Sequence, residues 1–272
     1  KVSKVAIPLL FLLFLILIGR TLTLPGALAG LKFYLWPDFS KLDFSVISAA
    51  LGQVFFSLSL GGTFLLTYAS YLPDDSDIKF SALSTGIGDG LAAVLAGLVI
   101  VPAAVAFDLK LNSGPSLTFI TVPSIFDKLP AGAVFSLLFF ALLFIAAYLS
   151  DVAAFEVLIA TLVDELNWSR KKAIVAMCLA ELALGTISMK SLDFLLKNDL
   201  IWGSTMQPVG SAMVLIGLTW IVGLRQTLLE INKGNGTRLI GRFWFYWSKY
   251  IIPMGIVVIL VLGLKDVFKA FF

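Results

Sequence analysis

The chain is dominated by apolar runs that are long enough to cross a lipid bilayer, which takes about 20 residues in a helix. Together these runs predict an all-α, polytopic membrane protein with about seven transmembrane helices. They lie at about 5–24, 51–71, 81–107, 133–163, 170–189, 200–224 and 247–271. Hydrophobic residues make up 59% of the sequence and charged residues only 14%, against about 25% charged in soluble domains. We therefore expect an integral membrane protein, and this interpretation depends on no single segment.

The composition excludes several classes of function. The sequence contains no histidine, which removes imidazole as a metal ligand or acid/base catalyst. It also has no Gly-x-Ser-x-Gly motif, and we expect no enzymatic activity. The net charge of +3 gives no case for binding nucleic acid. Cys178 is the one cysteine, so no intrachain disulfide can form.

The second apolar run has a centre that a simple membrane anchor would not need. It contains two serines, two adjacent glycines and a threonine: Ser57, Ser59, Gly61, Gly62 and Thr63. The glycines allow the helix to break, because they have no Cβ to restrict the backbone. In hydrocarbon the freed peptide groups are tolerated only where they are buried in protein or line a wet cavity. The sequence therefore predicts a discontinuous helix that binds an ion and a polar substrate; the alternative is a continuous helix whose small residues allow close packing.

Four carboxylates fall inside apolar runs, where an ionised group is costly and is a functional candidate by default. Asp89 has glycine neighbours, and Asp151 follows Ser150 and other small residues. A hydroxyl beside a carboxylate suits an oxygen-only site for a hard cation such as Na⁺. For Glu156 and Glu181 the favoured interpretation is a hydrogen bond to a neighbouring helix or a place near the membrane interface.

Several stretches resemble the neurotransmitter:sodium symporter family. Residues 53–61 (Gln-Val-Phe-Phe-Ser-Leu-Ser-Leu-Gly) and 67–71 (Thr-Tyr-Ala-Ser-Tyr) are similar to its unwound sixth helix. Residues 101–107 and 119–123 resemble its seventh helix and fourth extracellular loop, and 163–172 resemble the end of its eighth helix. The resemblance covers nearly the whole chain in order and implies the C-terminal part of that fold, from the fifth to the eleventh helix.

This resemblance implies a fold built from inverted five-helix repeats within one transmembrane domain, 1–272. Residues 1–24 would be the last helix of the first repeat, 51–224 the second repeat, and 247–271 an additional helix. The discontinuous helix would lie at 51–71.

The function implied is sodium-coupled symport of an amino acid or related small amine by alternating access, in the plasma membrane (the bacterial inner membrane). The partners implied are the substrate, the bilayer and the family's preceding helices. The alternative is a truncated or split membrane module without independent transport, which folds with a partner that supplies those helices.

The resemblance also implies a substrate pocket. Gly62 replaces a residue that is bulky in several relatives, so the pocket would accept a larger side chain. Asp199 matches the acid of the extracellular gate. The substrate-binding residues implied are Phe56, Ser57, Ser59, Gly61, Gly62, Ala153 and Ala154.

Na⁺ is the bound ion that the resemblance implies, at two sites. Ser57 and Asp89 match the first site, and Ala146 and Ser150 match the second. Leu149 replaces the hydroxyl or carboxylate usual at the second site, so that site would need Asp151 to turn inward. Ala93 stands where chloride-dependent members have serine, which argues against chloride dependence; Asp89 would supply the negative charge instead.

Overall fold

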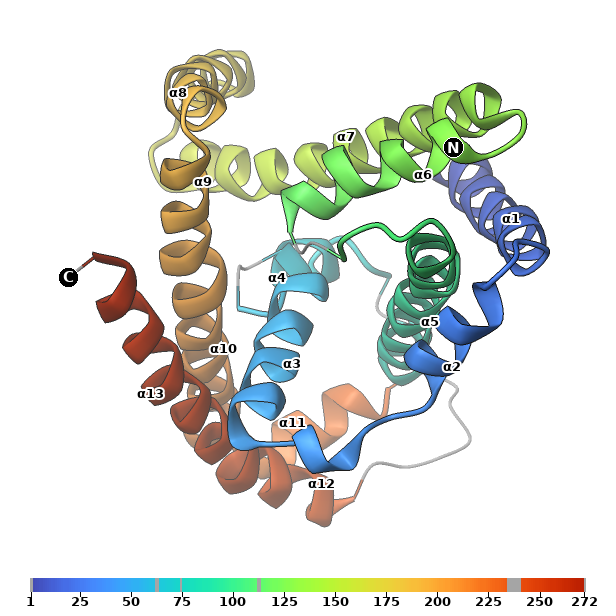
Figure 1. Cartoon of the computed structure of the whole chain (residues 1–272). Helices are drawn as coiled ribbons and strands as arrows, with labels where there is room; N and C mark the ends of the chain where they lie inside the picture. The colour runs from blue at the N-terminus through green and yellow to red at the C-terminus, as the bar shows by residue number, and fades with distance from the viewer. Residues whose placement is uncertain (1, 62–63, 74, 112–113, 234–240, 272) are drawn as a thin grey trace. The chain divides into compact units, whose positions relative to one another are not determined.

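The computed structural model describes residues 2–61, 64–73, 75–111, 114–233 and 241–271. Within these ranges the chain folds into helices and contains no strand, which confirms the all-α prediction (Figure 1). The α-helices are α1 (Val2–Leu22), α2 (Ala27–Leu35), α3 (Phe44–Ser57), α4 (Phe64–Ala69), α5 (Ile78–Ala106), α6 (Val122–Lys128), α7 (Gly132–Asp164), α8 (Arg170–Lys190), α9 (Leu192–Asn198), α10 (Gln207–Ile216), α11 (Gly223–Ile231), α12 (Arg242–Tyr246) and α13 (Ile252–Phe271). A 3₁₀ turn, η1 (Phe39–Lys41), and the π-helical segments η2 (Leu117–Thr121), η3 (Asp199–Met206), η4 (Gly217–Val222) and η5 (Trp247–Ile251) complete the described elements.

Six helical segments of the described chain are long and apolar enough to cross a membrane. They are Val2–Leu22, Ile78–Ala106, Gly132–Asp164, Arg170–Lys190, Leu192–Ile231 and Arg242–Val261. The remaining expected span, 51–71, is not among them because it is divided between α3 and α4, and neither piece is long enough alone. The discontinuous helix that the sequence predicts is therefore present.

The chain forms two compact units, and each is described by itself. Unit 1 comprises Lys1–Lys41 and Ile87–Val152, and unit 2 comprises Leu42–Gly86 and Ala153–Phe272. Helices α5 and α7 contribute residues to both units.

The core of unit 1 lies where α1, α5 and α6 meet. Leu17 of α1 is fully buried, and it belongs to one cluster with Val99 of α5 and with Ile125 and Phe126 of α6. Helix α2 packs closely on α5 as well, since a Cβ on Gly30 would lie 2.6 Å from Pro102 Cα. The apolar runs of the sequence did not predict α2.

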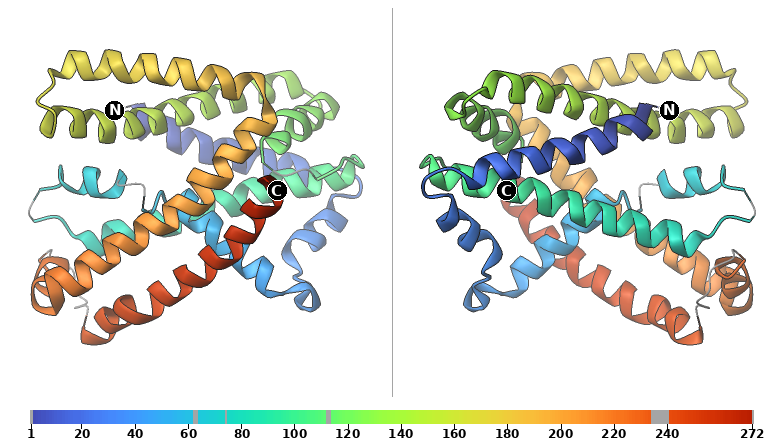
Figure 2. Two further views of the ribbon diagram at one scale, coloured as in Figure 1. Left: turned by 90° about the vertical axis from the view of Figure 1, so that its left-hand side faces the viewer. Right: turned by 90° about the vertical axis from the view of Figure 1, so that its right-hand side faces the viewer.

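Unit 2 is organised around the broken span. Helix α3 packs against η3, α10 and α13, and Phe55 of α3 is buried with Ile256 and Ile259 of α13. The segments α9, η3, α10 and η4 follow one another without interruption, and α11 follows a turn of the chain at Gly223, which has φ 82°. Helix α13 lies alongside η3 and α10 (Figure 2). Lipid is as apolar as a leucine side chain, so such helices associate through close packing and hydrogen bonds.

The closest packing in unit 2 is between two glycines. A Cβ on Gly61 would overlap Gln207 O, and a Cβ on Gly210 would overlap Gly61 O. The backbone of the broken span therefore touches the backbone of α10, and neither position has room for a side chain.

We predict that Gly210→Ala destabilises the protein by about 1–3 kcal/mol, the usual cost of overpacking a tight site. The matched control is Gly217→Ala on the same helical run, where an added Cβ meets nothing within 4 Å. The control should be neutral or stabilising, because alanine is the better helix former. The midpoint of thermal unfolding in detergent measures both, and equal midpoints for the two variants would contradict the glycine contact.

Candidate functional site

The break in the second span begins with a left-handed turn at the end of α3. Leu60 N donates to Phe55 O at 2.9 Å, and Ser59 N donates to Phe56 O at 3.0 Å. This pair of hydrogen bonds, with Ser59 at φ 51°, is the Schellman arrangement that ends many helices. The left-handed position usually holds glycine, so a serine there is strained.

The sequence placed the break at Gly61 and Gly62, and the structure starts it slightly earlier, at Ser59. Gly61 is the second left-handed residue, with φ 83°. Gly62 lies outside the described residues, and α4 begins at Phe64. A helix end leaves its last carbonyl groups without partners inside the helix, so the break presents polar backbone in the middle of an apolar span.

Two of the predicted site residues lie close to the same glycine of η3, Gly203. A Cβ on Gly203 would lie 2.8 Å from Asp199 Oδ1 and 3.4 Å from Phe56 Cδ2. The predicted gate carboxylate of η3 and the predicted pocket aromatic of α3 therefore flank the same glycine. A glycine at 203 leaves the space between them open.

The other predicted substrate residues lie on two elements of unit 2. Ser57 is exposed at the end of α3, and Ser59 and Gly61 are half-buried in the turn that follows it. Ala153 and Ala154 are half-buried on α7.

The predicted sodium ligands divide between the two units. Ser57 belongs to unit 2 and Asp89 to unit 1, so their pairing stays a prediction. In unit 1, Ser150 Oγ donates to Ala146 O at 3.1 Å, which brings the two expected oxygen ligands of the second site together on one turn of α7. Asp151 is exposed on the same helix, and Asp89 is half-buried on α5.

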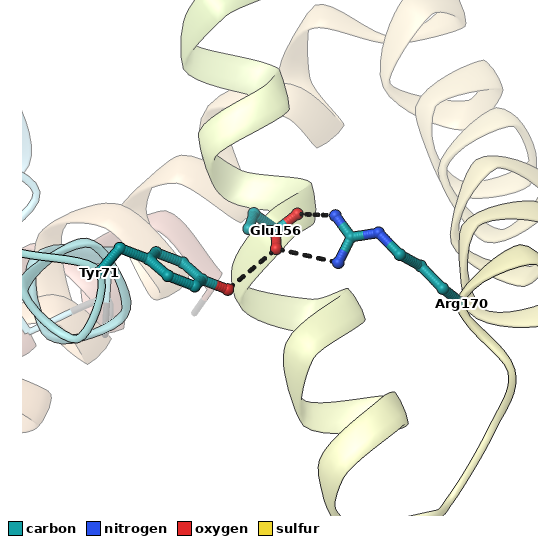
Figure 3. Close-up of polar contacts among 3 residues, drawn as sticks. All are labelled: Tyr71, Glu156 and Arg170. Atoms are coloured by element: carbon teal, nitrogen blue, oxygen red, sulfur yellow. Dashed lines mark hydrogen bonds and ion pairs between the residues drawn. The ribbon is translucent and has the colours of Figure 1, made fainter.

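A polar network that the sequence did not predict joins three segments of unit 2 (Figure 3). Arg170, the first residue of α8, donates to both carboxylate oxygens of Glu156 on α7, at 2.7 and 3.2 Å. Tyr71, just beyond α4, donates its hydroxyl to Glu156 Oε1 at 3.1 Å. We call these three residues the Glu156 network.

The Glu156 network confirms the expectation that Glu156 hydrogen-bonds neighbouring helices. Its partners lie 85 and 14 residues away in the sequence, so no local spacing marks Tyr71 or Arg170. Arg170 does follow a recognisable signal, since Ser169 caps α8 by accepting a hydrogen bond from Lys172 N.

The long apolar helices are typical of an integral membrane protein, and a broken span is a feature that membrane transporters share. The sequence matches the profile of the sodium:neurotransmitter symporter family over residues 1–271. The chain therefore belongs to this family of sodium-dependent transporters. The match confirms the resemblance seen in the sequence.

Relatives from two bacteria match almost the whole chain. It is 36% identical to an uncharacterized sodium-dependent transporter of Haemophilus influenzae, over 96% of this chain and 59% of that protein. It is 34% identical to the uncharacterized sodium-dependent transporter YhdH of Bacillus subtilis, over 95% of this chain and 60% of that protein. The chain thus spans about three fifths of the length of these relatives.

A solved structure shares the fold. The crystal structure of MhsT in complex with L-phenylalanine superposes with a TM-score of 0.86 at 33% identity, covering 96% of this chain and 62% of that one. The matched relatives are transporters, which agrees with the expectation of a non-enzymatic protein.

We predict that the Glu156 network contributes to stability through coupling between its members. Arg170→Gln should lower the unfolding midpoint by a few degrees, because it leaves the Glu156 side chain, which is 22% exposed within an apolar helix, without its cation. Glu156→Gln with Arg170→Gln should cost less than the sum of the two single changes. Tyr71→Phe should have the smallest effect, since it removes one hydrogen bond and no charge. The control is Glu181→Gln, an exposed carboxylate on α8, and strict additivity of the two changes would contradict the coupling.

Proposed function

We propose that this chain supplies about half of the substrate and ion sites of a sodium-coupled symporter that carries an amino acid or a related small amine by alternating access. The observation that carries the proposal is the broken span. A left-handed turn at Ser59 and Gly61 presents polar backbone within an apolar helix. Phe56, three residues before Ser59, lies close to Gly203 together with Asp199. Non-helical backbone at membrane depth is tolerated where it lines a cavity, and half-helix ends bind substrates and ions in transporters. The L-phenylalanine in the MhsT complex supports an amino-acid substrate.

In this proposal the substrate lies along the turn that follows α3, against the wall that Ala153 and Ala154 contribute from α7. Asp199 closes the pocket as a gate. We propose the same division of the domain as the sequence predicts. Residues 1–24 form the last helix of the first repeat, 51–224 form the second repeat, and 247–271 form an additional helix. The family's preceding helices complete the site, and the transporter works in the plasma membrane.

We propose two sodium sites. Ser57 and Asp89 contribute to the first, and Ala146, Ser150 and Asp151 to the second. The carbonyl of Ala146 and the hydroxyl of Ser150 are already neighbours, as hard-cation ligands must be. Chloride is not required, because Asp89 supplies a negative charge where Ala93 offers no ligand.

The Glu156 network has a mechanical consequence in this scheme. It ties the end of the short helix α4 to α7 and α8. Helix α4 therefore moves together with these two helices unless the hydrogen bonds of the network break. In this way the network couples movement at the helix break to movement of α7 and α8.

The test of the function is uptake by the complete protein, encoded by the full reading frame and reconstituted in proteoliposomes. A panel of amino acids that includes phenylalanine is offered with Na⁺, Li⁺ or choline outside. We expect concentrative uptake with Na⁺ and little with choline. Uptake that is equal in all three media would contradict sodium coupling. Uptake that requires a separately encoded second chain would instead favour the split module.

We predict that Asp89→Ala abolishes sodium-dependent substrate binding in the complete protein, because it removes the charged ligand of the first ion site. Binding of labelled substrate across a Na⁺ titration measures the effect. Glu181→Ala, which removes an exposed carboxylate from α8, should leave the titration unchanged. An unaltered Na⁺ dependence in Asp89→Ala would refute the role of Asp89.

A further inference from the structure

An ammonium group lies among aromatic rings where η4 and η5 contact each other. The Nζ of Lys249, in η5, is 4.8 Å from the centroid of the Trp220 ring in η4. It is also 5.8 Å from the ring centroid of Tyr250 and 6.0 Å from that of Phe245. We call these four residues, all in unit 2, the Lys249 cluster. The ring faces attract the cation and so hold it in place.

The Lys249 ammonium keeps hydrogen-bond donors for a further partner. Within the part of the chain that the structure describes, it pairs with no carboxylate. The acid nearest to it in the sequence, Glu230, is paired with Lys233 at 2.7 Å, and the sequence from 234 to 248 contains no Asp or Glu. A ring face offers a cation no lone pair, so the three donors of the ammonium stay available to an anion.

The sequence around the cluster has the composition of a membrane interface on the cytoplasmic side. Between 225 and 249 it contains one acidic residue, Glu230, and five basic ones: Arg225, Lys233, Arg238, Arg242 and Lys249. Basic loops between spans stay in the cytoplasm, and Trp and Tyr gather at the level of the lipid headgroups. Trp220 is 49% exposed and Tyr250 55%, which suits rings that place an apolar body in lipid and a polar tip in water.

An exposed apolar stripe continues from the cluster along the next helix. Tyr250, Met254, Val257 and Val261 are spaced three or four residues apart, and each is more than half exposed. At 1.5 Å per residue the stripe is roughly 16 Å long, which is about half of the ~30 Å hydrocarbon thickness of a bilayer. A cation with an aromatic collar therefore stands at one end of an apolar surface as long as a single leaflet is deep.

We propose that the Lys249 cluster binds an anionic phospholipid of the cytoplasmic leaflet. The Lys249 ammonium donates to the phosphate oxygens, and the rings of Trp220 and Tyr250 contact the glycerol region. One acyl chain lies along the stripe from Tyr250 to Val261. The negative surface of the cytoplasmic leaflet complements the basic loop, and the length of the stripe fits a lipid chain. This binding does not depend on the proposed transport function.

The binding test is native mass spectrometry of the complete protein, purified in detergent, stripped of lipid and titrated with dioleoyl phosphatidylglycerol. Phosphatidylcholine with the same chains is the comparison without net charge. We expect saturable binding of phosphatidylglycerol at a site that phosphatidylcholine does not fill. Lys249→Gln should raise the half-saturating concentration about fivefold, which corresponds to the ~1 kcal/mol that one basic residue contributes near an anionic surface. Lys249→Arg should bind as the unchanged protein does, because a guanidinium also binds phosphate and stacks on rings.

The matched control is Lys171→Gln, which removes the same charge from an exposed lysine in the first turn of α8. It should leave half-saturation within about twofold, since a distant charge acts only through the screened field. Equal weakening in Lys171→Gln and Lys249→Gln would show a general attraction to charge and would overturn the site. Displacement of the lipid by glycerol 3-phosphate would identify a soluble phosphate ligand and would overturn the lipid as occupant.

A second variant keeps the test decisive if Lys249→Gln does not fold, which gel filtration and the unfolding midpoint without lipid reveal. Trp220→Leu keeps the charge and removes the ring that holds it. It should weaken phosphatidylglycerol binding about two- to threefold, within the effect of one exposed cation–π contact. Binding that is the same in the unchanged protein and in every folded variant is the result expected if another helix of the complete protein covers the cluster. That result would overturn the proposal.

Discussion

The structure depends on one constraint: the peptide groups at the helix break need hydrogen-bond partners in an environment without water. Every peptide group in the hydrocarbon region needs a partner inside the protein, and the turn after α3 interrupts the helical ladder where that need is greatest. Two hydrogen bonds back to Phe55 and Phe56 end the helix in an orderly way. Helix α10 then lies directly against the turn, where Gly210 gives the carbonyl of Gly61 the room it requires. The break is thus a supported feature of unit 2, held by the packing of two backbones.

Buried hydroxyl groups accompany the irregular helical segments. Among the described residues, Thr205 of η3 donates to Leu200 O, Thr219 of η4 to Leu215 O, and Thr227 to Leu218 O within η4. Ser and Thr side chains can supply hydrogen bonds to the backbone where a membrane helix departs from regular geometry. The bond from Thr227 also crosses the turn at Gly223, so it fastens the start of α11 to η4. Ser211 differs from these threonines because its buried hydroxyl has no such partner within the described structure.

The carboxylate of Glu156, inside an apolar helix, is paired with a cation. Glu156 lies inside an apolar helix, and its cost is offset by the two-pronged contact of Arg170 and the hydroxyl of Tyr71. Both partners come from the ends of other helices, so the carboxylate fastens the segment after α4 and the start of α8 to the C-terminal part of α7. The same contacts that stabilise the carboxylate also link α7 and α8 to the second half of the broken span, so they determine which helices move with it.

The sequence by itself determined the membrane class, the positions of the long spans and the existence of the break, because these follow from local composition: about 20 apolar residues make a span, and adjacent glycines weaken one. Its family motifs named Phe56 and Asp199, but only the fold placed both of them close to Gly203. The tertiary structure alone decided that Ser59 is the first left-handed residue, that Gly61 meets Gly210, that Glu156 binds Tyr71 and Arg170, and that α2 packs on Pro102. The contacts of Gly61, Glu156 and α2 join residues that are separated in the chain, so the neighbours in sequence carry no record of the partner. The start at Ser59 is local, but left-handed positions usually hold glycine, so the sequence favoured Gly61 and Gly62 instead.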